Sequence, residues 1–362
     1  MRIALVHDWL LAKRGGEKVL AELCSMFPES PIYTLIYIEK YTMPIFKNRK
    51  IYTSLCQKFP FIKKYYRYLL PLYPVLIEQF NLHNYDLVIS LNHCVAKGII
   101  TPLNCHHISY CFTPMRYIWD QYWQYFPKQN LYTTITKAYF LNYLRIWDVS
   151  SSNRVDSFIA ISKFVASRIA KYYNRSAEII YPPVDTEFFT PSNEESNYFL
   201  IVSALVPYKN IHIAIEAFNE LKYPLKIIGS GPQKRFLKKI ANNNIEFINW
   251  VDDNTIKSYY RNCKALILPS EEDFGLVSLE AQACGKPVIT LAKGGGIETI
   301  IPQKTGISFN NASKYDIINA LKEFEKINFD KNLIRKHAEN FSKEKFKENF
   351  LLFIKNIEKK IL

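Results

Sequence analysis

The stretch that decides the fold is ALILPSEEDFGLVSLEAQACGKPVIT, residues 265–290. It begins with a short apolar run at residues 265–268 and ends in a second run at residues 288–291, and both are typical of buried parallel strands. Between them, apolar residues recur at helical spacing from Leu276, and Gly285 marks the helix end. We therefore expect a strand–helix–strand unit of an open α/β sheet, where ligands bind at the carboxyl ends of strands.

The turn between the first strand and the helix combines two carboxylates with a helix start. Glu272 lies in the turn, and Glu280 lies about one turn into the helix. The backbone N–H groups near Gly275 and Leu276 lack intrahelical partners and predict a site for an anion such as a diphosphate. Carboxylates beside that anion suit the sugar hydroxyls of a nucleotide sugar. The alternative is an ordinary solvated acidic turn, because two glutamates at this spacing are a weak signal alone.

Composition indicates a two-domain protein with an anionic partner. The 362 residues, 48% of them hydrophobic, exceed one typical domain. The formal net charge of +14 indicates nucleic acid, an anionic membrane surface or a phosphorylated substrate as partner. Seven scattered cysteines without a C-x-x-C pair predict reduced thiols. Without a signal peptide or 18 consecutive apolar residues, we expect a cytoplasmic protein without a membrane span.

The segment around the two glutamates is similar to a known signature. EDFGLVSLEAQACGKPVI, residues 272–289, resembles the donor site of the retaining family 4 glycosyltransferases. The resemblance covers nearly the whole chain and is closest to a bacterial subgroup that transfers mannose or related hexoses during surface-polysaccharide assembly. Four further segments carry it: HDWLLAKRGGEKVL at residues 7–20, SYCFTPMRYIWDQY at residues 109–122, YPPVD at residues 181–185 and VSALVPYKN at residues 202–210.

This resemblance implies an α/β fold of the GT-B type. Two Rossmann-like domains would face each other across a cleft, and the C-terminal helix would cross back to the N-terminal domain. The consecutive prolines Pro182 and Pro183 continue neither a helix nor a central strand and mark the hinge. We expect an acceptor domain at residues 1–182, a nucleotide-sugar donor domain at residues 183–342 and the crossing helix at residues 343–362.

In the first half, a glycine pair and an arginine are candidate ligand contacts. Gly15 and Gly16 precede a predicted helix at residues 18–27, where glycine lets the backbone approach a ligand closely. The resemblance implies that this loop contacts the transferred sugar and phosphates; the alternative is an ordinary turn. Arg116 is a candidate catalytic anion contact, with a structural salt bridge as the alternative. The family pattern also implies a histidine facing the donor sugar, but Phe112 occupies that position.

In the second half, Lys209 is the candidate cation. It precedes a predicted helix at residues 211–221, where the helix dipole disfavours a lysine unless an anion offsets its charge. The resemblance implies that Lys209 holds the diphosphate. Many family members carry an arginine five residues earlier, where this chain has Ala204. By resemblance, the other donor contacts are Ser203, Gly229, Trp250, Val251, Glu272, Phe274, Gly275, Leu276 and Glu280.

Residues 40–77 contain no Asp or Glu, and from Lys47 to Tyr73 basic and aromatic side chains are interleaved. This mixture suits an anionic lipid surface. It would also suit bases of a nucleic acid or be a solvated basic face. Because no nucleic-acid reading motif accompanies it, we expect a membrane surface and no nucleic acid.

A metal site is not expected. Cys105, His106, His107 and Cys111 are ligand types, but His106 and His107 would point to opposite faces of a strand. No D-x-D metal clamp stands out either. We predict an enzyme that needs neither a metal nor a cofactor.

Taken together, the residues and the resemblance predict a retaining hexosyltransferase. It would move a hexose, first mannose from GDP-mannose, to a lipid-linked saccharide at the inner face of the plasma membrane. Lys209 and the Gly275 and Leu276 amides would stabilise the departing diphosphate, Glu272 would bind donor-sugar hydroxyls and Glu280 the ribose. The alternatives are a UDP-sugar-dependent hexosyltransferase, a sugar-nucleotide epimerase and a catalytically weak sugar-nucleotide or membrane-binding scaffold.

Overall fold

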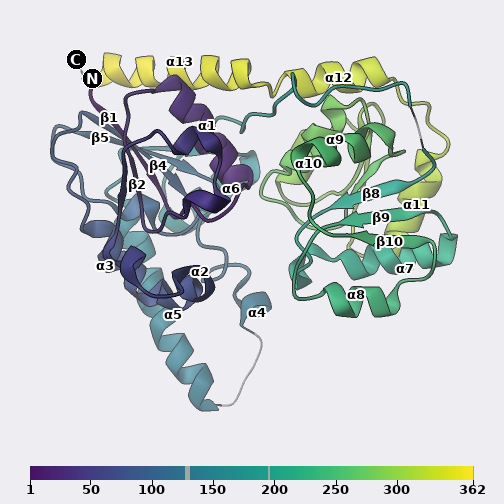
Figure 1. Ribbon diagram of the computed structural model, residues 1–362, viewed down its shortest axis with the longest axis horizontal. Helices are drawn as coiled ribbons and strands as arrows, with labels where there is room; N and C mark the ends of the chain where they lie inside the picture. The colour runs from purple at the N-terminus through teal and green to yellow at the C-terminus, as the bar shows by residue number, and fades with distance from the viewer. Residues whose placement is uncertain (127–130, 195, 362) are drawn as a thin grey trace. The chain divides into compact units, whose positions relative to one another are not determined.

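The computed structural model describes residues 1–126, 131–194 and 196–361. The chain divides into two compact units, Met1–Tyr181 and Pro182–Leu362, called unit 1 and unit 2 below. The division falls at the first of the two consecutive prolines. Each unit is built on its own parallel sheet with helices around it (Figure 1).

Within the described residues, the sheet of unit 1 has seven strands in the order β3-β2-β1-β4-β5-β6-β7. Every pair of neighbours is parallel. The chain starts at β1, moves outward through β2 to β3, and returns to β4 on the other side of β1. The strand order therefore reverses between β1 and β4, which makes their carboxyl ends the place where a ligand is expected. The strands are β1 Ile3–His7, β2 Ile32–Thr34, β3 Ile51–Thr53, β4 Leu87–Asn92, β5 His106–Cys111, β6 Ser157–Ala160 and β7 Ala177–Ile179.

The helices of unit 1 vary widely in length. Figure 1 shows the longest, α5, extending beyond the end of the sheet. Local sequence sets the ends of α6: the side chain of Ser162 accepts a hydrogen bond from the Val165 N–H, and Asn174 ends the helix in the left-handed conformation. The helices are α1 Gly15–Met26, α2 Ile62–Tyr65, α3 Tyr73–Glu78, α4 Tyr122–Tyr125, α5 Leu131–Ser152 and α6 Lys163–Tyr173.

The described sheet of unit 2 has six parallel strands in the order β10-β9-β8-β11-β12-β13. Its strand order reverses between β8 and β11. Strand β11, helix α10 and strand β12 form the strand–helix–strand unit that residues 265–290 predict, and they confirm it. The strands are β8 Phe199–Val202, β9 Leu225–Ile228, β10 Ile245–Ile248, β11 Leu266–Leu268, β12 Val288–Leu291 and β13 Gly306–Phe309.

Helices cover both faces of this sheet. Figure 1 shows α9 and α10 on one side of β8–β10, and α7 and α8 on the other. The last helix, α13, buries Phe346, Phe350 and Ile354, so its amphipathic pattern is real. Among the described residues, no helix combines the length and apolar character that a membrane span requires. The helices are α7 Ile211–Leu221, α8 Lys234–Ile240, α9 Asp253–Asn262, α10 Leu276–Ala283, α11 Lys314–Phe324, α12 Lys331–Glu339 and α13 Lys343–Ile361.

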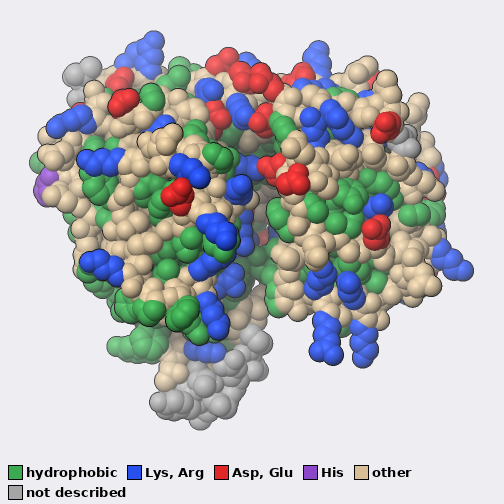
Figure 2. All heavy atoms as spheres, viewed as in Figure 1, with side chains coloured by type: hydrophobic (Ala, Val, Ile, Leu, Met, Phe, Trp, Pro, Cys, Tyr) green, Lys and Arg blue, Asp and Glu red, His purple; other side chains and the backbone are tan. Residues whose placement is uncertain are grey.

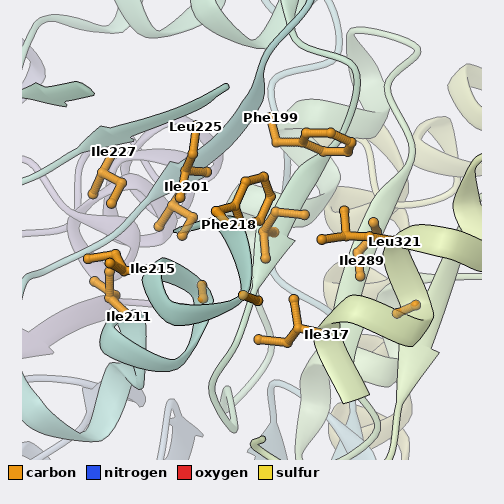
Figure 3. Packing of buried hydrophobic residues seen from close by; sticks show 14 of the residues in the cluster. Phe199, Ile201, Ile211, Ile215, Phe218, Leu225, Ile227, Ile289, Ile317 and Leu321 are labelled. Atoms are coloured by element: carbon orange, nitrogen blue, oxygen red, sulfur yellow. The ribbon is translucent and has the colours of Figure 1, made fainter. Parts of the chain in front are cut away.

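The core of unit 2 holds the carboxyl ends of its strands in place. Figure 3 shows Ile211 and Phe218 of α7 packed against strand side chains, with Ile317 of α11 beside them. Phe199 and Ile201 of β8 belong to the same buried cluster, because alternate residues of a strand share a face. Each such side chain contributes about 1.5–3 kcal/mol on burial. The packed core therefore fixes the positions of the strand ends from which the loops after β8 and β11 begin.

Candidate functional site

The first two predicted site residues meet at the strand-order reversal of unit 2. Lys209 ends a short 3₁₀ helix, Pro207–Lys209, after β8, and Glu272 lies in the turn after β11. Lys209 Nζ lies 2.7 Å from Glu272 Oε1 and 2.5 Å from Oε2. The Ser270 hydroxyl also donates to Glu272 Oε1, at 2.7 Å. The two charged side chains are 16% and 15% exposed, so the pair can be reached from solvent.

The backbone of the Glu272 turn is held by a glycine run. The Gly295 N–H donates to the Glu272 carbonyl at 2.7 Å, and Glu272 pairs with Gly294 in a parallel bridge. Gly294 has a positive φ of 77°, and a Cβ there would lie 2.5 Å from the Glu272 carbonyl oxygen. Side chains are thus excluded where the two loops touch, which fixes the position from which Glu272 reaches Lys209.

Helix α10 starts beside this ion pair. Gly275 precedes it in a left-handed conformation, with φ of 100°, and the first N–H groups of the helix, near Leu276, lack intrahelical partners. Phe274 is only 3% exposed, and its ring lies 6.0 Å from that of Phe341. The side chain of Phe274 therefore belongs to the core.

Glu280 is the most buried of the predicted donor contacts with a charge. It is 8% exposed, and its Oε2 accepts a hydrogen bond from the Tyr260 hydroxyl of α9 at 3.0 Å. Burial, reinforced by Glu280, raises the pKa of Tyr260 well above its usual value, so this hydroxyl keeps its proton. Tyr260 thereby fixes the direction of the Glu280 carboxylate.

The remaining predicted donor contacts lie at the same edge of the sheet. Ser203 follows β8, Gly229 follows β9, and Trp250 and Val251 follow β10. Trp250 is 53% exposed and available to a ligand. Gly229 has a packing role, since a Cβ there would lie 2.0 Å from the Ser203 carbonyl oxygen. All of these residues share the carboxyl edge of the sheet with Lys209.

Unit 1 places a different charge arrangement at its own strand-order reversal. The Asp8 carboxylate, fully buried after β1, accepts backbone N–H groups of the loop after β4 at 2.6–2.9 Å and lies 2.9 Å from His93 Nδ1. Burial alone would raise the pKa of Asp8, but the charge and hydrogen bonds of His93 outweigh burial and lower it to about 2. The donating N–H groups belong to His93, Cys94, Val95 and Ala96.

His7, the last residue of β1, is 1% exposed, and a hydrogen bond with the backbone of Trp9 contributes to its electrostatics. Burial, followed by the charge of His93, lowers the pKa of His7 to about 4, and Asp8 opposes this only in part. His7 is therefore neutral at pH 7. Sequence reasoning missed Asp8 and His93; their signal was two polar residues directly after adjacent apolar strands.

The structure corrects the prediction for the glycine pair of unit 1. Gly15 and Gly16 are the first two residues of α1, whereas the sequence placed them in a loop before a helix at residues 18–27. The helix begins earlier because Arg14 is extended and serves as the N-cap residue, and glycine costs little in a first turn, where the N–H groups are unpaired in any case. The pair still follows the carboxyl end of β1.

Two other residues of unit 1 that the sequence singled out, Arg116 and Phe112, follow strand β5. Arg116 lies after β5 and is partly buried, with its carbonyl accepting the Gln121 N–H. The Phe112 ring, where the family pattern implies a histidine, lies 6.4 Å from that of His7 and 6.5 Å from that of His93. The imidazole rings of His7 and His93 thus lie near the position at which the family pattern implies a histidine.

The candidate metal ligands are engaged in separate hydrogen bonds. His106 Nε2 lies 3.0 Å from Ser157 Oγ on β6, and His107 Nε2 lies 2.8 Å from Ser90 Oγ on β4. The described residues contain no group of three or more His, Cys, Asp or Glu placed to hold a metal ion. Metal-independent activity remains a prediction.

Two protein families together match almost the entire chain. Residues 13–188 match the family described as Glycosyltransferase Family 4, and residues 185–359 match Glycosyl transferases group 1. The chain is a family 4 glycosyltransferase. Its two Rossmann-like units give the glycosyltransferase the GT-B fold that the resemblance implied.

Curated relatives of the glycosyltransferase include an uncharacterized glycosyltransferase and two mannosyltransferases. It is 28% identical to an uncharacterized glycosyltransferase, MJ1178, of Methanocaldococcus jannaschii over 59% of this chain and 60% of that protein. It is 31% identical to the O-antigen chain mannosyltransferase RfbU of Salmonella typhimurium over 43% and 46%. A GDP-mannose-dependent α-(1-6)-phosphatidylinositol monomannoside mannosyltransferase of Mycolicibacterium smegmatis is 27% identical over 42% and 49%. The matches span less than two thirds of these relatives.

Solved structures agree on the fold. The lipopolysaccharide outer core galactosyltransferase WaaB superposes with a TM-score of 0.69 at 18% identity, over 98% of this chain and 100% of that one. Anabaena HepE in complex with UDP and glucose gives a TM-score of 0.69 at 15% identity, over 98% and 99%. At these identities the likeness concerns the fold alone.

Proposed function

We propose that this glycosyltransferase transfers a hexose, first mannose from GDP-mannose, to a lipid-linked saccharide during surface-polysaccharide synthesis, with retention of anomeric configuration. The observation that carries the proposal is the ion pair of Lys209 and Glu272 beside the start of α10. A cation and free helix N–H groups suit a diphosphate, and a nearby carboxylate suits sugar hydroxyls. The names of the relatives, an O-antigen chain mannosyltransferase and a GDP-mannose-dependent mannosyltransferase, support mannose as the first sugar to test.

Each residue then has a separate task. Donor binding turns Lys209 from Glu272 toward the diphosphate, where it and the N–H groups near Gly275 and Leu276 stabilise the charge that grows on the leaving group. Glu272 then binds hydroxyls of the transferred sugar. Glu280, fixed by Tyr260, binds the ribose, and Trp250 borders the base. In unit 1, Arg116 and the glycines of α1 keep the anion- and sugar-contact roles that the resemblance implies.

The surface of unit 1 supports a lipid-linked acceptor and a location at a membrane. Exposed aromatic and aliphatic side chains there include Phe61 at 78% and Tyr68 at 79%, and Lys63, Lys64 and Arg67 are exposed among them. Figure 2 shows lysines and arginines scattered among hydrophobic side chains on this unit. Such a surface binds anionic lipid headgroups, so the enzyme would work on the inner face of the plasma membrane.

A thermal-shift panel of nucleotide sugars tests the donor. A ligand that binds only the native protein raises its Tm, so GDP and GDP-mannose are expected to raise it and UDP-sugars to raise it less. Product formation in EDTA and the anomeric configuration of the product, read by NMR, test metal independence and retention. The epimerase alternative predicts a changed sugar in donor incubated alone, and the scaffold alternative predicts binding without turnover. If none of these nucleotides shifts the Tm, the proposal fails.

A UDP-linked hexose is the second candidate. Two solved proteins of the same fold, the galactosyltransferase WaaB and HepE in complex with UDP and glucose, indicate which other donors to test. A larger Tm shift with UDP-glucose or UDP-galactose than with GDP-mannose would replace the first candidate.

Vesicle co-sedimentation tests the membrane surface. Replacing Lys63 and Lys64 by Glu should weaken binding to phosphatidylglycerol vesicles, because each basic residue near the surface contributes about 1 kcal/mol. The adjacent lysines Lys238 and Lys239 of α8, exposed in unit 2, provide a control with the same charge change. Equal losses from both double variants would show that net charge, and not this surface, governs binding.

A further inference from the structure

An open pocket of about 470 Å³ lies in unit 1, between the loop after β5, the short helix α4, helix α5 and the end of α6. Helix α6 starts directly after β6, at the carboxyl edge of the sheet. Tyr172, which lines the pocket, lies in the last turn of α6, about 14 Å further along the helix. The pocket is therefore distant from the edge at which the strand-order reversal places a ligand.

Arg145 of α5 brings a positive charge to this pocket. Its Nε donates to the Ile118 carbonyl at 2.6 Å, and its guanidinium lies over the Tyr122 ring, 5.1 Å from the centroid. These two contacts fix the plane of the guanidinium. Within the described ranges, no carboxylate pairs with Arg145, and its two terminal nitrogens make no hydrogen bond. The N–H groups of these nitrogens are therefore available to a ligand.

Aromatic side chains form the walls of the pocket. Trp119 stacks on Tyr172, with 4.8 Å between the ring centroids and 15° between the ring planes. The Trp119 Nε1 donates to the buried Asp148 carboxylate at 2.8 Å, which fixes the direction of the indole. Trp123 meets Tyr122 edge-on at 4.8 Å and is 67% exposed. The pocket thus presents an oriented cation between aromatic faces.

Asp120 also lines the pocket, but its charge is compensated. The buried Arg168 donates to the Asp120 carboxylate and, through Nη1, to the Thr113 hydroxyl at 2.6 Å. Lys171, whose Nζ lies 5.7 Å from the centroid of the Tyr172 ring, adds a second cation near the wall. The charge of Arg145 is therefore not cancelled, and the pocket favours an anion.

Helix α5 connects this pocket to an exposed apolar face. Residues 121–147 contain no Asp or Glu. Figure 1 shows α5 extending beyond the end of the sheet. Four apolar side chains that are 40–74% exposed recur at spacings of four, four and three residues and so share one face of α5: Ile135, Tyr139, Tyr143 and Ile146. Because Ile146 directly follows Arg145, the apolar face begins beside the pocket.

We propose that the pocket binds the phosphate of an anionic lipid, with Arg145 as the phosphate ligand and the apolar face of α5 in contact with the hydrocarbon chain. A guanidinium matches two phosphate oxygens, and Trp and Tyr favour the boundary between hydrocarbon and water. A free anion would leave the apolar face of α5 uncovered. Two sources supply a lipid phosphate: a phospholipid of the bilayer and the lipid carrier of the acceptor. Only the second source rests on the proposed function.

Isothermal titration calorimetry on the full chain tests the site with farnesyl phosphate, farnesol, dihexanoyl phosphatidylglycerol and inorganic phosphate, each below its micelle concentration. Arg145→Gln should raise Kd for the lipid phosphates about tenfold, because a charge-assisted contact is lost. The matched control is Arg235→Gln, at an exposed arginine of α8 with the same charge change, and it should leave Kd unchanged. Ile146→Ser should weaken binding of farnesyl phosphate and not of inorganic phosphate.

The two lipids distinguish the sources. If the site binds phospholipids of the bilayer, dihexanoyl phosphatidylglycerol binds at least as tightly as farnesyl phosphate, and Arg145→Gln weakens co-sedimentation with phosphatidylglycerol vesicles. If it binds the lipid carrier, farnesyl phosphate binds more tightly, and Arg145→Gln leaves vesicle binding unchanged.

A spectroscopic readout on the wild-type protein covers the case in which Arg145→Gln folds poorly. The indole N–H resonance of Trp123, assigned with Trp123→Phe, should shift on adding farnesyl phosphate and shift less with farnesol. This readout depends on occupancy of the pocket and not on the packing of Arg145 against Tyr122.

Three results would overturn the inference. The first is that Arg145→Gln matches Arg235→Gln for both lipid phosphates. The second is that inorganic phosphate binds as tightly as farnesyl phosphate, which would mean an adventitious ion only. The third is a Trp123 resonance that saturating lipid phosphate leaves in place. Failure of the proposed function is a separate outcome: if no nucleotide sugar shifts the Tm while Arg145 still governs binding of lipid phosphates, the donor proposal fails and this site stands.

Discussion

The two units place a carboxylate at the same topological point but treat it differently. In unit 1, Asp8 is fully buried and accepts four backbone N–H groups as well as His93. In unit 2, Glu272 is partly exposed and accepts from two side chains, Lys209 and Ser270. The backbone N–H groups that donate to Asp8 are fixed by the chain, whereas the side chains that donate to Glu272 can rotate away from it.

This contrast separates a structural role, that of Asp8, from a proposed ligand-binding role, that of Glu272 and Lys209. Asp8 is solvated by the protein itself and serves to hold the β4 loop and His93. In the proposed function, Glu272 and Lys209 compensate each other only until a ligand arrives, because each can be satisfied by a different partner. The same type of fold would thus build one permanent and one exchangeable charge site.

The largest effect is expected at the exchangeable site. Lys209→Ala should lower turnover about 10²–10³-fold, as expected for one lost electrostatic contact to a leaving group. Lys314→Ala, which breaks the exposed ion pair with Glu220, is the matched control in unit 2 and should leave turnover unchanged. Steady-state kinetics with the donor identified by thermal shift decide the matter. Equal turnover in both variants would remove Lys209 from the reaction.

The buried side of the comparison predicts a pH dependence. The pKa of His7 falls from 6.5 to about 4 on folding, so between these pH values the unfolded chain binds more protons and stability rises with pH. The shift corresponds to about 3 kcal/mol, fully present as destabilisation below pH 4 and absent above pH 6.5. Urea unfolding from pH 4 to 7 measures it. His7→Gln should flatten the slope, leaving the part due to His107, whose pKa is lowered to about 3.

A smaller effect distinguishes the two carboxylates directly. Asp8→Asn turns an acceptor toward four backbone donors into a group with its own N–H₂, so the free energy of unfolding should fall by about 2 kcal/mol. Glu272→Gln, at the exchangeable site, should cost less than about 1 kcal/mol. Urea unfolding at pH 7 compares the two variants. If Glu272→Gln lowered the free energy of unfolding more than Asp8→Asn, Glu272 and not Asp8 would have the structural role.

The sequence predicted the site residues of unit 2 better than those of unit 1 for physical reasons. The apolar runs and glycines of residues 265–290 act locally, so strand, helix and strand emerged within a residue or so of their bounds. The meeting of Lys209 with Glu272 followed from topology, because both succeed strands that turn out to be neighbours. Their ion pair could not be predicted, since it depends on the turn that Gly294 and Gly295 hold.

The charge arrangement of unit 1 depends on contacts between residues that are distant in sequence. Asp8 follows β1 and His93 follows β4, so their contact forms only when the two strands pair. Neither residue belongs to a local motif that predicts a buried carboxylate. The start of α1 was misplaced because it depends on the extended backbone of Arg14, which composition does not reveal. Helix α13, by contrast, has a local signal, because Phe346 and Phe350 recur at four-residue spacing.

If Lys209 binds the diphosphate as proposed, its ion pair with Glu272 would also make the resting enzyme selective among anions. Glu272 would act as a competitor tethered to the same protein, and tethering gives it an effective concentration of about millimolar or more. A monovalent buffer anion would have to displace Glu272 with a single charge and would gain little. A diphosphate that also bound the N–H groups of α10 would displace it readily, so Lys209 would stay unavailable to abundant small anions until a donor arrived.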